Sequence, residues 1–260
     1  MVVFPWLKKK DKLVLVFDIG SSSVGGALFW TQESGVPRII KAVRESIPLQ
    51  ESLNIDKFLF STMKSLESVT NQIHKAGLGV PSSCFCVLSS PWHVSQARVI
   101  KLQKNTPFLF TPKLALDLIQ KETALFEEEY LAKYKDIHSA FRSIEFKNIK
   151  TMLNGYETLK PLNQKAQDLE MTILISISPE QVLKKIEETI GKHYHFKDIK
   201  FSSFSLASFV VVRDIHSHNE NFLLIDIGGE VTNISRIKKN ILRESVSFPL
   251  GCTFIIRKVA

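Results

Sequence analysis

Two short stretches of the sequence share a pattern that suits phosphate binding: an apolar run, then Asp-Ile-Gly, then small residues. Their candidate ligand-binding residues are Asp18, Gly20, Ser21, Ser22 and Ser23 in the first stretch and Asp226, Gly228, Gly229 and Thr232 in the second. Glycine lets the backbone turn sharply and approach a ligand closely. Consecutive N–H groups in such a turn bind anions, and hydroxyls add further donors. A carboxylate there would repel phosphate directly, so we expect Asp18 and Asp226 to hold Mg²⁺ through its waters.

The repetition of this pattern decides between two interpretations. A single Asp-Ile-Gly turn is weak support, because hairpins often use Asp and Gly only for their backbone conformations. Two copies, each expected to close a buried strand and to open a hairpin, favour two related half-folds. An Asp at the carboxyl end of a buried parallel strand points into the crevice where open α/β sheets bind ligands. We therefore expect the two turns to face each other and to bind a triphosphate.

The elements that would position these turns alternate between strands and helices, as expected of an α/β fold. The predicted strands are 12–20, 23–30, 38–47, 83–90, 93–102, 143–153, 171–178, 221–229, 230–237 and 241–250. The predicted helices are 56–75 with Gly77 as its stop, 112–132, one capped by Ser178 with Pro179 at its first position, 205–213, and one that begins at 251.

The stretch from about 92 to 168 differs from the rest of the chain in its order of expected strands and helices. A strand is followed by a helix with an acidic centre, then by further strands and a turn at Asn154-Gly155. This order predicts a small strand-helix-strand-strand unit inserted into the α/β frame. We expect the acidic run 127–129 to form a solvated helix face rather than a contact surface for a basic partner.

Composition narrows the classes of function. The net charge is +8, but the basic residues are spread out and no nucleic-acid motif is present, so we expect no nucleic-acid partner. Three cysteines, Cys84, Cys86 and Cys252, do not make a disulfide framework, which predicts a reducing, cytoplasmic setting. We expect no metal site at the histidine pairs 193/195 and 216/218. No apolar stretch approaches the roughly 20 residues of a membrane span. The leader 1–12 is predicted to lie against the body, with a weak membrane-surface anchor as the alternative.

The two Asp-Ile-Gly stretches resemble the two phosphate motifs of the actin-like ATPase superfamily, whose fold is ribonuclease H-like. The quoted segments are "DIGSSSVGGAL" and "LLIDIGGEVTNI". The inserted unit is similar in placement to subdomain IC of the bacterial cell-division protein FtsA and its pilus-assembly relative PilM. The resemblance implies a leader at 1–12, subdomain IA at 13–82 and 169–213, IC at 83–168, and a partial IIA at 214–260, with IIB absent.

The resemblance also implies roles for individual residues. Asp18 and Asp226 match carboxylates that organise Mg²⁺ through water, and Gly251 matches the first glycine of a pair that ends the second hairpin. The serines of the first stretch and Gly228, Gly229 and Thr232 match the phosphate loops. The implied cofactors are ATP and Mg²⁺. The implied partners are other proteins of a division or pilus assembly, with self-association and peripheral contact at the inner face of the membrane as further expectations.

Several positions depart from the family's pattern. Glu230 stands where the second loop usually has Gly, and a carboxylate there would repel phosphate unless it turns away or joins the metal shell. Asn233 replaces a frequent Asp, and Gly25 stands where pilus-type relatives often carry Lys. The segment 204–209 holds no Gln or Glu to orient an attacking water, so we expect weak hydrolysis or none.

The end of the chain leaves alternatives open. The family continues beyond the second hairpin into IIB and a glycine-rich adenosine motif, whereas this sequence stops at Ala260 within an expected helix. We therefore expect a fragment rather than a shortened relative. One hypothesis for function is an ATP-binding protein of the FtsA/PilM type. The other is a scaffold of the same fold that no longer binds nucleotide. A sugar or acetate kinase of the superfamily is less favoured, because such kinases do not ordinarily carry this insert.

Overall fold

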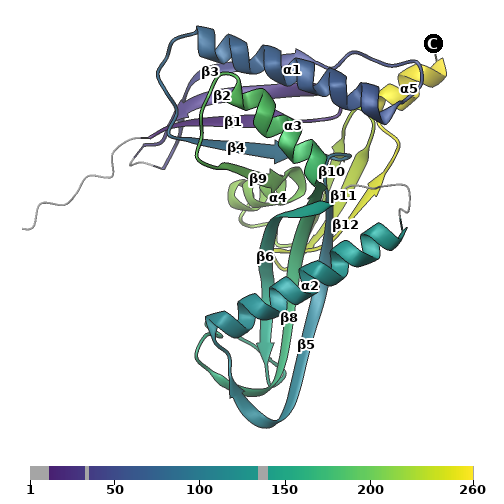
Figure 1. Ribbon diagram of the computed structural model, residues 1–260. Coiled ribbons are helices and arrows are strands. Elements are labelled where there is room, and N and C mark those ends of the chain that lie inside the picture. Colours follow the sequence, from purple (N-terminus) through teal and green to yellow (C-terminus); the bar gives the residue numbers. More distant parts are fainter. Residues whose placement is uncertain (1–11, 33–34, 134–139, 260) are drawn as a thin grey trace, which may run out of the picture. The chain divides into compact units, whose positions relative to one another are not determined.

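The computed structural model describes residues 12–32, 35–133 and 140–259 (Figure 1). The leader predicted at 1–12 lies outside the described residues except for Lys12. The chain forms two compact units. The first comprises the chain up to Val87 together with Lys185–Phe201, and the second comprises Leu88–Lys184 and Ser202–Ala260. Each unit carries one of the two Asp-Ile-Gly turns.

The first unit is built on a five-stranded sheet in the order β3-β2-β1-β4-β9. Its strands are β1 (Leu13–Ile19), β2 (Ser23–Trp30), β3 (Arg38–Ser46), β4 (Ser83–Leu88) and β9 (Ile199–Ser203). Alternate residues of β1 are fully buried, among them Leu15, Phe17 and Ile19. Strand β1 is therefore the central, apolar strand that its sequence predicts.

Helix α1 (Ile55–Lys75) packs on β2 and β3, as Figure 1 shows. Asn54 caps the helix by accepting a hydrogen bond from the Lys57 N–H, and Gly77, at φ +64°, follows its end. A Cβ on Gly26 of β2 would lie 2.6 Å from Val69 and 2.7 Å from Ile73. The absence of a side chain at Gly26 thus lets α1 approach the sheet closely.

The second unit contains a four-stranded sheet and a helix, formed by the stretch where the strand-helix-strand-strand unit was predicted together with the strand predicted at 171–178, which had been expected to belong to the frame. These elements are β5 (Val94–Leu109), α2 (Pro112–Lys133), β6 (Phe141–Leu153), β7 (Tyr156–Glu157) and β8 (Lys165–Pro179), with the strands in the order β5-β8-β6-β7. Buried residues of α2 and of the sheet, such as Ile119, Phe126 and Ile175, form one core. Arg98 of β5 also donates to Glu122 at 2.7 Å and to both carboxylate oxygens of Glu129 on α2. Glu129 of the acidic run thus has an internal partner.

The same unit holds the three-stranded sheet β10-β11-β12. Its strands are β10 (Phe222–Ile227), β11 (Thr232–Lys238) and β12 (Ile241–Phe248), and the neighbouring helices are α4 (Phe204–Ile215) and α5 (Cys252–Val259). Helix α4 packs its Phe209 against Ile237 and Leu242 of this sheet. Helix α3 (Glu180–Gly191) runs across the boundary between the two units.

Most predicted elements are confirmed, including the turn at Asn154-Gly155, where φ is positive. Three details differ. Ser178 does not cap α3, because β8 continues to Pro179 and the Ser178 hydroxyl donates to the Trp92 carbonyl at 2.7 Å. Strand β10 is not buried on both faces, since Leu223, Ile225 and Ile227, which share one face, are more than half exposed. Strand β9 had not been predicted.

Cys84 and Cys86 lie on one face of β4 and are fully buried. Burial raises the pKa of the Cys86 thiol well above its ordinary value. Within the three described ranges, no helix combines the length and apolarity needed to cross a membrane.

Candidate phosphate-binding loops

The first candidate loop connects β1 to β2 in the first unit. The Gly20 N–H donates to the Ser23 carbonyl at 3.1 Å, and this bond closes the turn. A Cβ on Gly20 would lie 3.0 Å from the same carbonyl oxygen, so the turn is tight enough to favour glycine. The Ser21 side chain is buried, whereas Ser22 is exposed. The turn therefore presents a short, polar backbone segment at the end of a buried strand.

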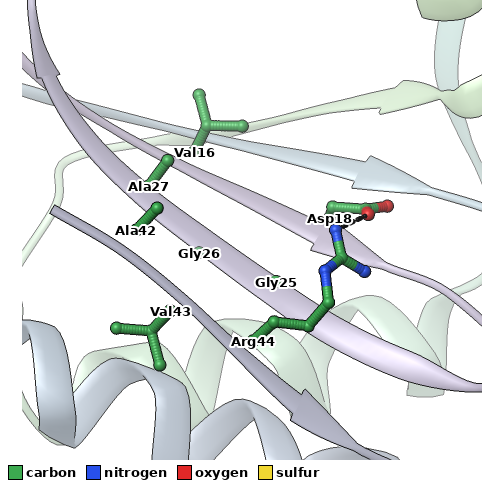
Figure 2. Close-up of a pocket in the computed structure, with 8 residues that line it drawn as sticks. All are labelled: Val16, Asp18, Gly25, Gly26, Ala27, Ala42, Val43 and Arg44. Carbon is green, nitrogen blue, oxygen red and sulfur yellow. Dashed lines mark hydrogen bonds and ion pairs between the residues drawn. The ribbon is translucent and has the colours of Figure 1, made fainter. Parts of the chain in front are cut away.

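Asp18, at the end of β1, is paired with an arginine that the sequence interpretation had missed. Arg44 of β3 donates from Nη2 to the Asp18 carboxylate at 2.9 Å (Figure 2). Its Nη1 donates to the Ser23 hydroxyl at 2.7 Å. The Asp18 side chain is 36% exposed and that of Arg44 is 59% exposed. This ion pair therefore lies at the surface of the first unit, where ion pairs contribute little to stability.

Strand register explains how Arg44 reaches Asp18. In β1–β2 pairing Asp18 lies opposite Gly25, and in β2–β3 pairing Gly25 lies opposite Arg44. The three residues form one row across three strands, and Gly25 at its centre has no side chain. A Cβ there would lie 2.9 Å from Nη2 of Arg44. All three strands were predicted, so aligning their registers was the signal that could have found Arg44.

A cavity of about 300 Å³ adjoins this ion pair in the first unit. Its lining consists of Asp18, Arg44 and small apolar residues of the three strands: Val16, Gly25, Gly26, Ala27, Ala42 and Val43. Figure 2 shows the Asp18 and Arg44 side chains meeting at one end of this row of short side chains. The charged groups are thus concentrated at the loop end of the cavity.

The second candidate loop connects β10 to β11 in the second unit. The Gly228 N–H donates to the Val231 carbonyl at 3.0 Å and closes this turn, as the Gly20 bond does in the first loop. The first residues of α5 bind the back of the turn. The N–H groups of Cys252 and Thr253 each donate, at 2.9 Å, to the carbonyls of Gly228 and Gly229 respectively.

Gly251 makes this close approach possible. A Cβ on Gly251 would lie 2.0 Å from the Gly229 carbonyl oxygen and 2.7 Å from the Glu230 nitrogen. Both are backbone atoms, so no side-chain rotation would relieve the clash. Gly251 therefore fixes α5 to the second loop for a steric reason.

Glu230, the residue that departs from the family's pattern, is held by α5. Its carboxylate accepts from Arg257 through both oxygens, at 2.9 Å for Oε1, and from the Thr253 hydroxyl at 2.7 Å. The hydrogen bonds from Arg257 lower the pKa of the Glu230 carboxyl, burial acts in the opposite direction, and Thr253 adds to the lowering. Glu230 is 7% exposed. The negative charge of Glu230 is thus compensated by Arg257 of α5.

Asp226 and Thr232 have partners of their own. The Asn233 amide donates to the Asp226 carboxylate at 3.3 Å, and its carbonyl oxygen accepts from Ser90 at 2.9 Å and from Ser247 at 2.7 Å. The Thr232 hydroxyl donates to the Leu250 carbonyl. Asn233 is therefore a buried amide that orients Asp226, and Thr232 joins the ends of the β11–β12 hairpin.

These residues fit a phosphate group with a magnesium ion. Each turn begins with glycine and has a carboxylate two residues before that glycine, Arg44 adds a cation to the first turn, and the Glu230 carboxylate of the second turn is paired with Arg257. In the described ranges no three or more His, Cys, Asp or Glu side chains are grouped as metal ligands. Mg²⁺ commonly keeps several waters and uses one or two carboxylates together with substrate phosphates, so such a group is not required.

The chain has an α/β arrangement, and comparison with solved structures shows an actin-like ATPase fold. No family model and no curated protein matches the sequence. Solved structures do match. One is a chain of a PilM–PilN type IV pilus biogenesis complex, with 12% identity, a TM-score of 0.56, and coverage of 95% of this chain and 68% of that chain.

A second match is a Bacteroides thetaiotaomicron protein described as having an actin-like ATPase fold and unknown function. It shows 11% identity and a TM-score of 0.51, with 99% of this chain and 79% of that chain covered. A Ppx/GppA family protein of Aquifex aeolicus matches with 13% identity, a TM-score of 0.40 and coverage of 93% of this chain, but this chain spans only 52% of that one. The predicted fold class, α/β and actin-like, is confirmed.

Proposed function

We propose that this chain is an ATP-binding protein of the FtsA/PilM type that acts in the assembly of a pilus or cell-division complex. The observation that carries the proposal is the pair of Asp-Ile-Gly turns, each closed by an equivalent backbone hydrogen bond and each opening a hairpin. In this proposal both loops contribute N–H groups to the phosphates of one ATP. Asp18 and Asp226 hold Mg²⁺ through its waters.

The subdomain assignment is part of the proposal. Residues 13–82 and 169–213 would form subdomain IA, 83–168 the inserted IC, and 214–260 part of IIA. Protein partners would bind mainly through the insert, in keeping with the match to a PilM–PilN complex. Self-association and a position at the inner face of the membrane belong to the same hypothesis.

Hydrolysis is proposed to be weak or absent. The first turns of α4 hold serines and apolar residues, and the Ser208 hydroxyl is engaged with the Phe204 carbonyl at 2.6 Å. Neither group is a general base for water.

The experiment that tests the proposal measures binding of a fluorescent ATP analogue to the 260-residue chain, with and without Mg²⁺. Asp18→Asn and Asp226→Asn should each lower the affinity measured with Mg²⁺. Asp117→Asn, which changes an exposed carboxylate of α2, is the matched control and should bind as the wild type does. Absence of binding up to millimolar nucleotide, or two loop variants that both bind like wild type, would refute the proposal.

A second candidate is a scaffold that keeps the fold without nucleotide. The observation that favours it is the ion pair of Asp18 with Arg44, which engages the carboxylate assigned to magnesium. This candidate predicts that capture of a partner protein by the chain does not change on addition of ATP and Mg²⁺. A change in the captured amount would exclude it.

A further inference from the structure

We propose that Arg44 is a phosphate-binding residue at the first loop. When nucleotide binds, the Arg44 guanidinium leaves Asp18 and binds the phosphates. The inference rests on the proposed function and names a residue that the Asp-Ile-Gly pattern does not contain. It is carried by the row Asp18–Gly25–Arg44 across β1, β2 and β3.

The Arg44 side chain can extend along this row only because Gly25 has no side chain. Neighbouring strands lie about 4.8 Å apart, so Arg44 must cross about 10 Å of sheet to meet a residue two strands away. Its Nη2 lies 2.9 Å from the position that a Cβ on Gly25 would occupy, and 2.9 Å from the Asp18 carboxylate. The guanidinium therefore lies over the middle strand, next to the turn that would hold phosphate.

The chemistry of the guanidinium suits this place. Arginine has five N–H donors in a planar fork and binds phosphate through two parallel hydrogen bonds. The contacts with Asp18 and Ser23 use one hydrogen on each Nη nitrogen. A phosphate at the loop can thus be met by the same group after a small rotation of an exposed side chain.

The ion pair also changes the net charge beside the loop. A lone Asp18 carboxylate would repel an incoming phosphate, whereas the pair with Arg44 has no net charge. With Mg²⁺-ATP, Asp18 would hold the metal through its waters, and Arg44 would be released to bind the phosphates. In metal-free ATP, the phosphate charge would be met by Arg44, which lies 2.9 Å from the Asp18 carboxylate, without help from a metal. Arg44 should therefore matter more for metal-free ATP than for Mg²⁺-ATP.

The test compares wild type with Arg44→Ala, Arg44→Lys and the double variant Gly25→Lys/Arg44→Ala, by calorimetric titration with ATP in excess Mg²⁺ and in EDTA. Removing charged hydrogen bonds predicts that Arg44→Ala loses about 10- to 100-fold in affinity, with the larger factor in EDTA. Arg44→Lys should keep part of the affinity. The double variant should regain part of the lost affinity, because residue 25 lies opposite both Asp18 and Arg44, so that a lysine there places a cation in the same row. Arg38→Ala, an exposed arginine of the same strand, is the matched control and should change affinity less than twofold.

Inorganic tripolyphosphate, titrated in parallel, separates this inference from the proposed function. If wild type binds ATP through Asp18 and Asp226 while Arg44→Ala binds equally well, the inference is wrong and the proposed function stands. If Arg44→Ala binds more tightly, Arg44 blocks the loop and the inference is also wrong. If wild type binds tripolyphosphate in an Arg44-dependent way but not ATP, the inference holds and the proposed function fails. If wild type binds neither ligand, both fail.

Discussion

Replacing Gly251 by Ala should separate α5 from the second loop. The new Cβ would lie 2.0 Å from the oxygen and 2.4 Å from the carbon of the Gly229 carbonyl. Carbon atoms in proteins do not approach backbone atoms so closely, and a backbone carbonyl cannot rotate aside as a side chain can. The start of α5 must therefore move by an ångström or more.

The size of the effect follows from the bonds that this movement breaks. The N–H groups of Cys252 and Thr253 donate to the carbonyls of Gly228 and Gly229 at 2.9 Å, and the Thr253 hydroxyl shares its one proton between the Gly229 carbonyl at 2.6 Å and the Glu230 carboxylate at 2.7 Å. At about 1 kcal/mol net for each hydrogen bond, their loss amounts to about 3 kcal/mol. This agrees with the roughly 1–3 kcal/mol typical of overpacked sites. We expect the free energy of unfolding of the second unit to fall by about 2–4 kcal/mol.

Urea unfolding followed by circular dichroism measures this loss, and hydrogen exchange at the Cys252 and Thr253 amides locates it. Gly191→Ala is the matched control, because no atom lies within 4 Å of a Cβ at that helical glycine. Alanine favours helix over glycine by up to about 1 kcal/mol, so the control should be neutral or slightly stabilised. The reasoning fails if Gly251→Ala is as stable as wild type and both amides keep their protection.

Two further predictions concern pH. Because Arg257 lowers the pKa of Glu230 in the folded chain, the stability from this carboxylate is present above its ordinary pKa of about 4.5 and is lost as pH falls through the folded value. Glu230→Gln should therefore lower the free energy of unfolding by about 1.5–3 kcal/mol at pH 7, and this loss should become smaller below pH 4.5. A loss of stability that does not vary between pH 3 and 7 would contradict the prediction. Burial lowers the pKa of His93 from 6.5 to about 4. The contribution of the neutral imidazole to the free energy of unfolding is therefore complete above pH 6.5, and it falls by roughly 1.4 kcal/mol per pH unit down to about pH 4. His93→Phe should flatten the pH dependence of urea unfolding in that range, and an unchanged slope would refute the assignment.

Much of the fold could be predicted from local patterns. Continuous apolar runs predicted β1 and β8, helical spacing predicted α1 and α2, and the Asn154-Gly155 turn was predicted from its residue types. These features depend on residues close in sequence, where periodicity and turn chemistry determine the backbone. Both Asp-Ile-Gly turns were found for the same reason.

The errors involve neighbours distant in sequence. Ser178 has the residue type of a helix cap, but its hydroxyl meets the carbonyl of Trp92, 86 positions away. The apolar run of β10 resembles that of β1, yet only β1 has strands on both sides. Arg44 could not be assigned to Asp18 without the register of three strands. Arg257 could not be assigned to Glu230 without the steric fit at Gly251.

Two of the departures from the phosphate motifs, Gly25 and Glu230, share one physical explanation. Gly25 removes a side chain from the first loop, and Arg44 uses the space to pair with Asp18. Glu230 adds a carboxylate to the second loop, and Arg257 pairs with it. In each case an arginine from the element that packs beside the loop cancels one negative charge. Repulsion from Glu230 is therefore no argument against phosphate binding, since its charge is compensated before any ligand arrives. Asp226 accepts a hydrogen bond from the Asn233 amide, and Asp226→Asn tests directly whether this carboxylate holds the proposed magnesium ion.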